Sequence, residues 1–177
     1  MLSPPIVLCI LILNNGDTVF VYDDSSPYYE RVTIDTSISF IGENKETTIV
    51  DGENNGTVIK INVDGVIVTG FTIKRSTNKP GISYRGIDIY SSNNQIYENI
   101  ICNHYIYGIA VVNSTNNEIF SNYIYSTNKC IGTSETENIK IYDNTINSGE
   151  TAIALTKSSN IEISNNTIES AVERGIS

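Results

Sequence analysis

The chain has 177 residues and a formal net charge of −9, with three cysteines, one histidine, one methionine and no tryptophan. This length fits a single domain, and the negative charge argues against a nucleic-acid partner, because phosphate backbones are bound by clustered lysines and arginines. Isoleucine, asparagine, serine and threonine are abundant, which is typical of strands and turns and not of helices.

The first fifteen residues are the least regular part of the chain. The apolar run at positions 6–13 (IVLCILIL) is too short to span a bilayer. It has no basic segment before it and no small-residue cleavage site after it. We expect residues 1–15 to form an irregular strand or a cap over the open end of the domain that follows. The alternative is a signal-peptide remnant.

Short alternating segments separated by turn residues follow from position 16. The predicted strands lie at 17–22, 28–34, 38–42, 47–50, 57–63 and 66–73. Phe40, Val68 and Ile96 stand 28 residues apart, so these opening repeats are long, and loops such as 75–85 carry the excess. In repeat proteins such insertions lie on one side of the molecule and often form its binding face.

Columns of like residues recur from position 86 onward, at steps of 22 or 23 residues. The columns are Ile87, Ile109, Ile131, Ile153 and Ile176; Ile96, Ile119, Ile141 and Ile163; Asn99, Asn122, Asn144 and Asn166; and Ile101, Ile124, Ile146 and Ile168. Apolar and polar positions alternate within each repeat, which indicates strands. A fixed period of this length is typical of a solenoid.

One repeat cannot fold alone. It buries about four aliphatic side chains, worth roughly 1.5–3 kcal/mol each, whereas ordering its residues costs on the order of 1–2 kcal/mol per residue. Stacked repeats can pair their strands about 4.8 Å apart. We therefore predict an all-β fold, a right-handed single-stranded parallel β-helix over residues 16–177 with about six or seven coils, and we expect it to continue into further coils of a longer chain.

The asparagine column suits a corner between strands. Asparagine tolerates the left-handed backbone conformation that a sharp bend needs, and stacked amides can hydrogen-bond from coil to coil. We predict a structural ladder of Asn99, Asn122, Asn144 and Asn166. The alternative is a set of ordinary polar turn residues.

The opening repeats resemble a known family. The segments GDTVFV at 16–21, YYE at 28–30, IGEN at 41–44 and TIVDG at 48–52 resemble the first coils of the NosD-like, CASH-type β-helix proteins, which share the pectin-lyase-like fold. The resemblance covers residues 16–177. It implies an extracellular or cell-surface protein of archaea or bacteria, but it says little about function, since the repeats encode packing. Residues 1–15 do not match the helix that usually comes first in this family.

Catalysis by a β-helix of this kind requires two carboxylates facing one groove, about 5–10 Å apart for glycoside hydrolysis. The outward positions of the strand at 86–89 and its equivalents contain one carboxylate, Asp88. We therefore assign no catalytic residue, and whether the chain is an enzyme stays open. The alternative is a polysaccharide-degrading hydrolase or lyase with carboxylates from Asp23, Asp24, Glu30 or Asp88.

Two further groups could bind ligands. Asp23, Asp24 and Glu30 offer the hard oxygen ligands that calcium prefers, although a solvated acidic loop explains them as well. The rings of Tyr97, Phe120 and Tyr142 form one outward column, with Tyr123 and Tyr125 beyond the corner. Such a row could stack on sugar faces or only stabilise neighbouring strands.

The predicted function is thus a non-catalytic secreted or cell-surface module, structural or weakly carbohydrate-binding. Its expected partner is a polysaccharide or cell-surface glycan. We expect no nucleic acid, no membrane-spanning segment and no cofactor other than calcium. Cys102 and Cys130 are expected to act as small apolar residues.

Overall fold

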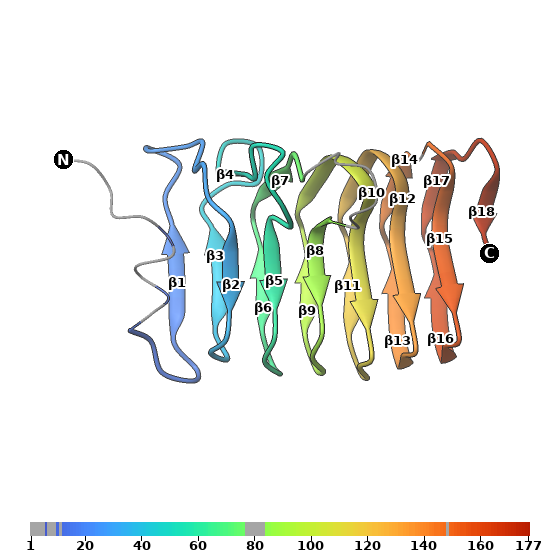
Figure 1. Ribbon diagram of the computed structural model, residues 1–177, viewed down its shortest axis with the longest axis horizontal. Coiled ribbons are helices and arrows are strands. Elements are labelled where there is room, and N and C mark those ends of the chain that lie inside the picture. The colour runs from blue at the N-terminus through green and yellow to red at the C-terminus, as the bar shows by residue number, and fades with distance from the viewer. Residues whose placement is uncertain (1–5, 7–9, 11, 77–83, 148) are drawn as a thin grey trace.

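The computed structural model describes residue 6, residue 10 and residues 12–76, 84–147 and 149–177. The chain winds as a solenoid whose coils follow one another along a single axis from the N-terminus to the C-terminus (Figure 1). Every strand pairing found is parallel, and one sheet has a strand from each of seven coils. The predicted parallel β-helix is therefore confirmed.

The strands are short and numerous. They are β1 (Thr18–Val21), β2 (Val32–Ile34), β3 (Ser39–Gly42), β4 (Ile49–Asp51), β5 (Ile59–Ile61), β6 (Ile67–Thr69), β7 (Thr72–Lys74), β8 (Arg85–Ile89), β9 (Gln95–Tyr97), β10 (Ile100–Val112), β11 (Glu118–Phe120), β12 (Tyr123–Ser134), β13 (Glu137–Tyr142), β14 (Thr145–Asn147), β15 (Thr151–Thr156), β16 (Ser159–Ser164), β17 (Thr167–Ser170) and β18 (Arg174–Ile176).

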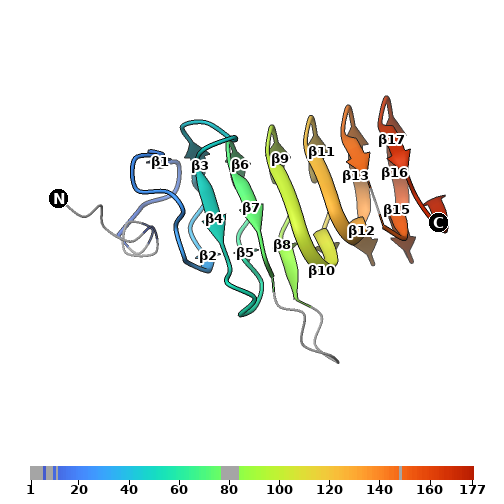
Figure 2. The ribbon, with the colours of Figure 1, turned by 90° about the horizontal axis from the view of Figure 1, so that it is seen from above.

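The strands line three faces, which Figure 2 shows from above. The first face is the sheet β1-β3-β6-β9-β11-β13-β16. The second contains β4, β7, the start of β10 and β12, and then β14 and β17. The third contains β2, β5, β8, the end of β10 and β12, and then β15 and β18. We expected only short strands; β10 and β12 instead run through the corner between the second and third faces.

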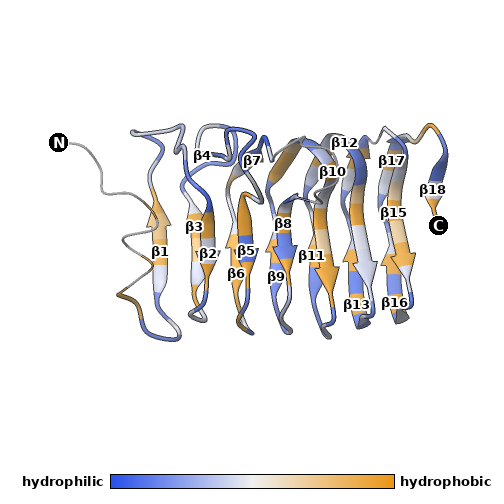
Figure 3. Cartoon of the chain, viewed as in Figure 1, coloured by the Kyte–Doolittle hydropathy of each residue, from blue (hydrophilic) through white to orange (hydrophobic). Residues whose placement is uncertain are grey.

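The core is a column of aliphatic side chains inside the coils. Val68, Ile96, Ile119 and Ile141 pair in register along the first sheet and have no exposed surface. Hydrophobic and hydrophilic residues alternate along the strands (Figure 3), because successive side chains of a strand point to opposite faces. The isoleucine columns of the sequence therefore form the interior as far as Ile153, whereas in the last coils Ile163 and Ile168 are half-buried and Ile176 is 52% exposed.

A ladder of asparagines closes the corner after the first sheet in the later coils. The amide Nδ2 of Asn99 donates to Oδ1 of Asn122 at 3.2 Å, Asn122 donates to Asn144 at 3.0 Å, and Asn144 donates to Asn166 at 2.9 Å. Each Oδ1 also accepts a backbone N–H from the preceding coil, beginning with that of Phe71 at 3.1 Å. The ladder thus satisfies buried backbone groups that water cannot reach.

The expectation that these asparagines adopt the left-handed conformation was wrong. The residues with positive φ are those directly before them, Glu98, Ser121, Asp143 and Asn165, at 52° to 55°. The preceding residue makes the bend, and the asparagine side chain is left pointing into the coil. There its Nδ2 reaches carbonyl oxygens, such as that of Ile96 from Asn122 at 2.8 Å.

The opening coils turn the equivalent corner differently. Gly42 and Gly70 approach so closely that a Cβ on Gly42 would lie 2.2 Å from the carbonyl oxygen of Gly70. Phe71, buried and stacked on Phe40 with ring centroids 4.4 Å apart, fills the space inside. Apolar packing therefore replaces the amide ladder where the coils are long.

The described residues near the N-terminus pack on the solenoid. Ile6 and Ile10 belong to the hydrophobic core, with 3% and 6% of their surface exposed, and the backbone N–H of Ile6 donates to Glu30 Oε1 at 3.0 Å. That residues 1–15 form a strand or cap stays a prediction. Among the described residues, no helix has both the length and the apolar character needed to cross a membrane.

Candidate functional site

The aromatic row of the first sheet is a face-to-face stack. The ring centroids of Tyr97 and Phe120 lie 4.7 Å apart at an interplanar angle of 11°, and those of Phe120 and Tyr142 lie 4.8 Å apart at 1°. The rings are half-buried. Because each ring covers its neighbour, a sugar cannot lie across the row, and ring faces are available only at the two ends of the stack.

The free face of Tyr97 borders a hollow. In the preceding coil its register partner is the small Thr69, so no ring continues the stack on that side. The hollow has a volume of about 470 Å³. It is lined by Ile41, Gly42, Glu43, Asn44, Lys45, Thr69, Gly70, Tyr97 and Glu98. The site thus combines one aromatic wall with two glycines and several polar side chains.

The local sequence explains why this hollow stays open. Neither Gly42 nor Gly70 can carry a side chain, because a Cβ on either would lie 2.2 Å from the carbonyl oxygen of the other. Asn44 lies in a turn between β3 and β4 and accepts the backbone N–H of Glu46 through Oδ1 at 3.0 Å. The turn between β3 and β4 therefore borders the hollow on one side. The corner at Gly42 and Gly70 forms its base, where no side chain fills the space.

Tyr123 and Tyr125 do not join this row. They lie on the second face, with ring centroids 5.0 Å apart and tilted by 33°. A hydrogen bond with Cys102, together with burial, raises the pKa of Tyr125 to about 12. Tyr125 therefore stays protonated at neutral pH, and Cys102, buried like Cys130 and not in a disulfide, packs as a small side chain.

The two most buried carboxylates are neutralised by arginines. Asp51 is ion-paired with Arg75 and lies 3.7 Å from Lys74 Nζ. Burial opposes ionisation of Asp51, but hydrogen bonds from Arg75 and from the backbone of Glu53 keep the pKa below its usual value. Asp88 lies 2.6 Å from the guanidinium of Arg85. An ion-paired carboxylate is a poor proton donor, so neither residue suits the role of a general acid.

Two of the predicted calcium ligands have different hydrogen-bond partners. Asp23 Oδ2 accepts the hydroxyl of Thr47 at 2.6 Å, whereas Glu30 accepts the backbone N–H of Ile6. In the described part of the chain, no group of three or more His, Cys, Asp or Glu side chains is placed to hold a metal ion. Asp23, Asp24 and Glu30 are thus not gathered into one site.

The single histidine is a structural residue inside the solenoid. His104 Nδ1 accepts the backbone N–H of Ser76 at 3.2 Å, and Nε2 lies 3.0 Å from the carbonyl oxygen of Ile73. Because a backbone N–H can only donate, the ring is the neutral tautomer with its proton on Nε2. Burial lowers the pKa of His104 to about 4, although the hydrogen bond to Ile73 opposes this.

The comparisons with known proteins agree with this architecture. The family described as the right-handed β-helix region matches residues 6–177. The chain therefore belongs to this family. No curated protein matches the chain, and no solved structure matches it.

Sequence reasoning found the ring column but missed the hollow at its end. The signals were present in hindsight: Gly42 and Gly70 occupy corresponding positions of two long coils, and the small Thr69 directly precedes Gly70. What the sequence does not contain is the rotamer of each ring, which decides whether the row presents faces or edges to solvent.

Proposed function

We propose that the chain is a non-catalytic carbohydrate-binding module of a secreted or cell-surface protein of the NosD-like type. The bound sugar packs on the free face of Tyr97 within the adjoining hollow. The observation that carries this proposal is that the aromatic stack ends at a hollow instead of at another ring.

The chemistry of the lining suits a sugar. A pyranose presents C–H groups on one face, which pack on an aromatic ring, and hydroxyls at its edge, which need hydrogen-bond partners. Asn44, Glu43, Lys45 and Glu98 lie around the hollow and can supply donors and acceptors. One apolar wall with a few polar groups is a common composition of small-ligand sites.

The two carboxylates that are paired with arginines support binding without cleavage. A hydrolase needs one carboxylate that can donate a proton and a second that acts as base or nucleophile. Asp51 and Asp88 are each held in an ion pair with an arginine, and both lie outside the hollow beside Tyr97. The hollow itself is lined by two other carboxylates, Glu43 and Glu98, so a polysaccharide-degrading activity is the alternative that the cleavage assay tests.

The test is a glycan-array screen with calcium and with EDTA, followed by mass spectrometry of each bound glycan. We expect binding without cleavage, lost on Tyr97→Ala. The matched control is Tyr142→Ala, which removes the ring at the other end of the same stack. Equal loss in both variants would place the site elsewhere, cleavage would indicate an enzyme, and silence on all glycans would leave a structural spacer. Dependence on calcium would restore the predicted metal site.

A further inference from the structure

The hollow beside Tyr97 has an acidic lining. Among the side chains that line it, Glu43 and Glu98 are carboxylates and Lys45 is the one cation. Both glutamates are exposed, and within the described residues neither forms an ion pair with a lysine or an arginine. The charge of the hollow is therefore negative and is not balanced by the chain itself.

The fourth coil supplies both the ring and one of these carboxylates. Tyr97 follows Thr69 in the register of the first sheet. Glu98 comes directly after Tyr97, at the corner position that Gly70 occupies one coil earlier, and the backbone N–H of Gly70 donates to the carbonyl oxygen of Glu98 at 3.3 Å. A small residue and a glycine thus give way to a ring and a carboxylate in one step, and both of the larger side chains border the same space.

Glu43 lines the hollow from the other side. It follows Gly42, two coils before Glu98, so the two backbone positions lie about 10 Å apart along the solenoid axis, which is twice the strand spacing. Glu43 Oε2 accepts the backbone N–H of Asp23 at 3.0 Å, which brings a further acidic residue next to the rim. The hollow therefore lies between carboxylates that come from different coils.

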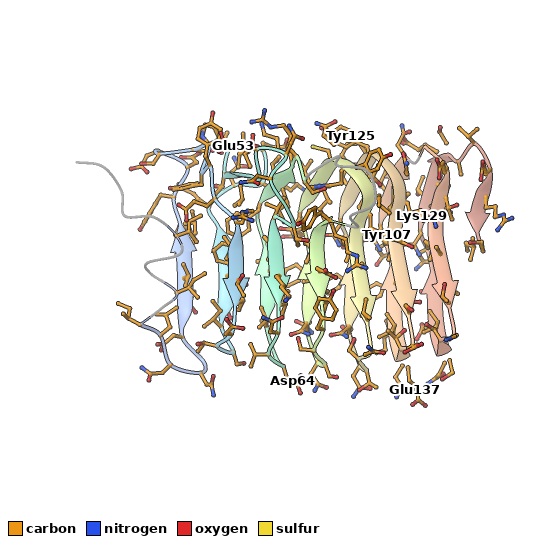
Figure 4. The ribbon with its side chains drawn as sticks, viewed as in Figure 1. Glu53, Asp64, Tyr107, Tyr125, Lys129 and Glu137 are labelled. Carbon is orange, nitrogen blue, oxygen red and sulfur yellow. The ribbon has the colours of Figure 1, made fainter. Side chains whose placement is uncertain are left out.

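Other tyrosine rings of the chain already contact a cation. Lys60 Nζ lies 5.3 Å from the ring centroid of Tyr90, and Lys129 Nζ lies 5.4 Å from that of Tyr107, beside which Figure 4 shows it. In the described part of the chain Tyr97 has no such contact, and its ring neighbour, Phe120, covers the opposite face. A free aromatic face and unpaired carboxylates thus occur together in this hollow.

The lining favours an organic cation over a metal ion. Across the described residues, no three His, Cys, Asp or Glu side chains are grouped so that they could hold a metal ion. Calcium needs six to eight oxygen ligands, whereas an ammonium group has only three protons to donate. The volume of about 470 Å³ lies within the range of small-molecule sites. The hollow therefore suits a small organic molecule that carries positive charge.

We propose that the hollow recognises an amino sugar through its protonated amine, an inference that rests on the proposed function of the same site. In glucosamine the amine is equatorial and lies at the edge of the sugar ring. When the C–H face of the sugar packs on Tyr97, the ammonium group projects past the aromatic ring and donates charge-assisted hydrogen bonds to Glu98 or Glu43. Asn44 is placed to meet a hydroxyl at another edge.

The experiment measures affinity by calorimetry for three trisaccharides that share one β-linked backbone and differ in a single substituent. They are the trimers of glucosamine, N-acetylglucosamine and glucose, which carry an ammonium group, an acetamide and a hydroxyl at the same carbon. Tetralysine is the fourth probe and represents a basic peptide. The measurements are made at about pH 6, where an amine is protonated and an ordinary glutamate is ionised.

The test variant is Glu43→Gln with Glu98→Gln, which keeps the size of both side chains and removes their charge. The charge-matched control is Glu137→Gln with Glu150→Gln, since both residues are exposed and lie outside the hollow. Lys45→Gln is a further variant, because it removes the one cation of the lining. Circular dichroism checks that each protein is folded.

We expect the glucosamine trimer to bind about tenfold more tightly than the other two trisaccharides. The test variant should lose this preference, whereas the control should change affinity by less than about twofold. Lys45→Gln should raise the affinity for the glucosamine trimer by up to about fivefold, which damage to the fold would not do.

The remaining outcomes separate this inference from the function on which it rests. Equal binding of all three trisaccharides, lost on Tyr97→Ala, would overturn the amino-sugar inference and leave the carbohydrate site in place. No binding of any trisaccharide would overturn both. Equal loss in the test and control variants would show that only the overall charge matters, and tighter binding of tetralysine would indicate a peptide site; either result would overturn the inference.

Discussion

The opening coils and the later coils solve the same packing problem in different ways. Between the second and the fourth coil, residues at equivalent positions of successive coils lie 28 residues apart. In the later coils they lie 22 or 23 residues apart. The later coils close their corner with an amide ladder, and the opening coils close it with Gly42, Gly70 and Phe71. The hollow beside Tyr97 and two others, one lined by Lys60 and one by Asp51, open on the long coils. The regular repeats thus provide the hydrogen-bonded scaffold, and the long, irregular repeats carry hollows on its surface.

Replacing Phe71 by alanine should have the largest effect on stability. Phe71 is fully buried and stacks on Phe40 at 4.4 Å, so its removal leaves a cavity at the corner that lacks an amide ladder. We expect the free energy of unfolding to fall by about 4 kcal/mol, measured by urea denaturation. Phe20→Ala is the control, because Phe20 is 47% exposed and its loss should cost less than about 1 kcal/mol. A loss for Phe71→Ala as small as that for Phe20→Ala would show that the opening coils do not depend on a packed corner.

His104 should make stability depend on pH at the junction between the two regions. The ordinary pKa of about 6.5 applies to the unfolded chain, and burial lowers the pKa in the folded chain to about 4. Between these values the unfolded state binds a proton that the folded state excludes. Stability should therefore be constant above pH 6.5 and fall by about 3 kcal/mol as the pH is lowered to about 4.

Urea denaturation over this pH range checks the histidine prediction. His104→Gln lowers stability at every pH, but it should remove the slope between pH 6.5 and 4. The ion pair of Asp51 contributes little to this slope, because its stabilisation is lost as the pH falls through the ordinary pKa of 3.8 toward the lowered folded value, so most of that loss lies below pH 4. A variant that retains the full slope would show that other groups titrate there.

The sequence was sufficient to predict the scaffold of the molecule, that is, its strand register and its buried face. A period read from Ile96, Ile119 and Ile141 fixes both the strand register and the buried face, because a one-residue slip would turn every side chain outward. The asparagine column is visible for the same reason. A second buried amide pair, Asn94 with Asn117 at 2.9 Å, escaped notice, because Ile139 takes that position in the next coil and the column is only two residues long.

The surface was less predictable. The ring column of Tyr97, Phe120 and Tyr142 is evident, but whether rings lie flat on the sheet or stack on one another depends on rotamers set by neighbouring coils. The cations Arg31, Lys60 and Lys129 share no repeat position: in the column that runs from Val32 through Ile59 to Ile131, they stand one before, one after and two before their column residue. Their proximity follows only from the register of the folded coils.

Replacing Asn122 by alanine tests the later coils in the same way as Phe71→Ala tests the opening ones. Asn122 is 2% exposed and donates to Ile96, Phe120 and Asn144. Its loss leaves buried backbone groups without partners, and we expect a loss of about 2 kcal/mol in urea denaturation. The control is Asn147→Ala, which removes only an exposed hydrogen bond to Glu169 and should cost less than about 0.5 kcal/mol. Equal losses of stability in the two variants would mean that a ladder asparagine contributes no more than an exposed polar residue.

Phe120→Leu should have the smallest effect on stability, and it tests the ring stacking alone. Leucine keeps an apolar side chain at the middle of the stack but removes both ring contacts, at 4.7 and 4.8 Å. Aromatic pairs contribute about 0.5–1.5 kcal/mol beyond the area that they bury. Because the rings are half-buried, we expect a loss of about 1 kcal/mol in the free energy of unfolding.

The control for this substitution is Tyr105→Leu, since Tyr105 is 45% exposed and should change stability by less than about 0.5 kcal/mol. The same Phe120→Leu protein also shows whether the middle ring only orients Tyr97 or contacts the ligand itself. If the stack only orients Tyr97, glycan affinity falls a little with stability. If affinity is lost while the fold persists, the middle ring contacts the ligand itself, and the site extends along the later coils instead of ending at the long ones.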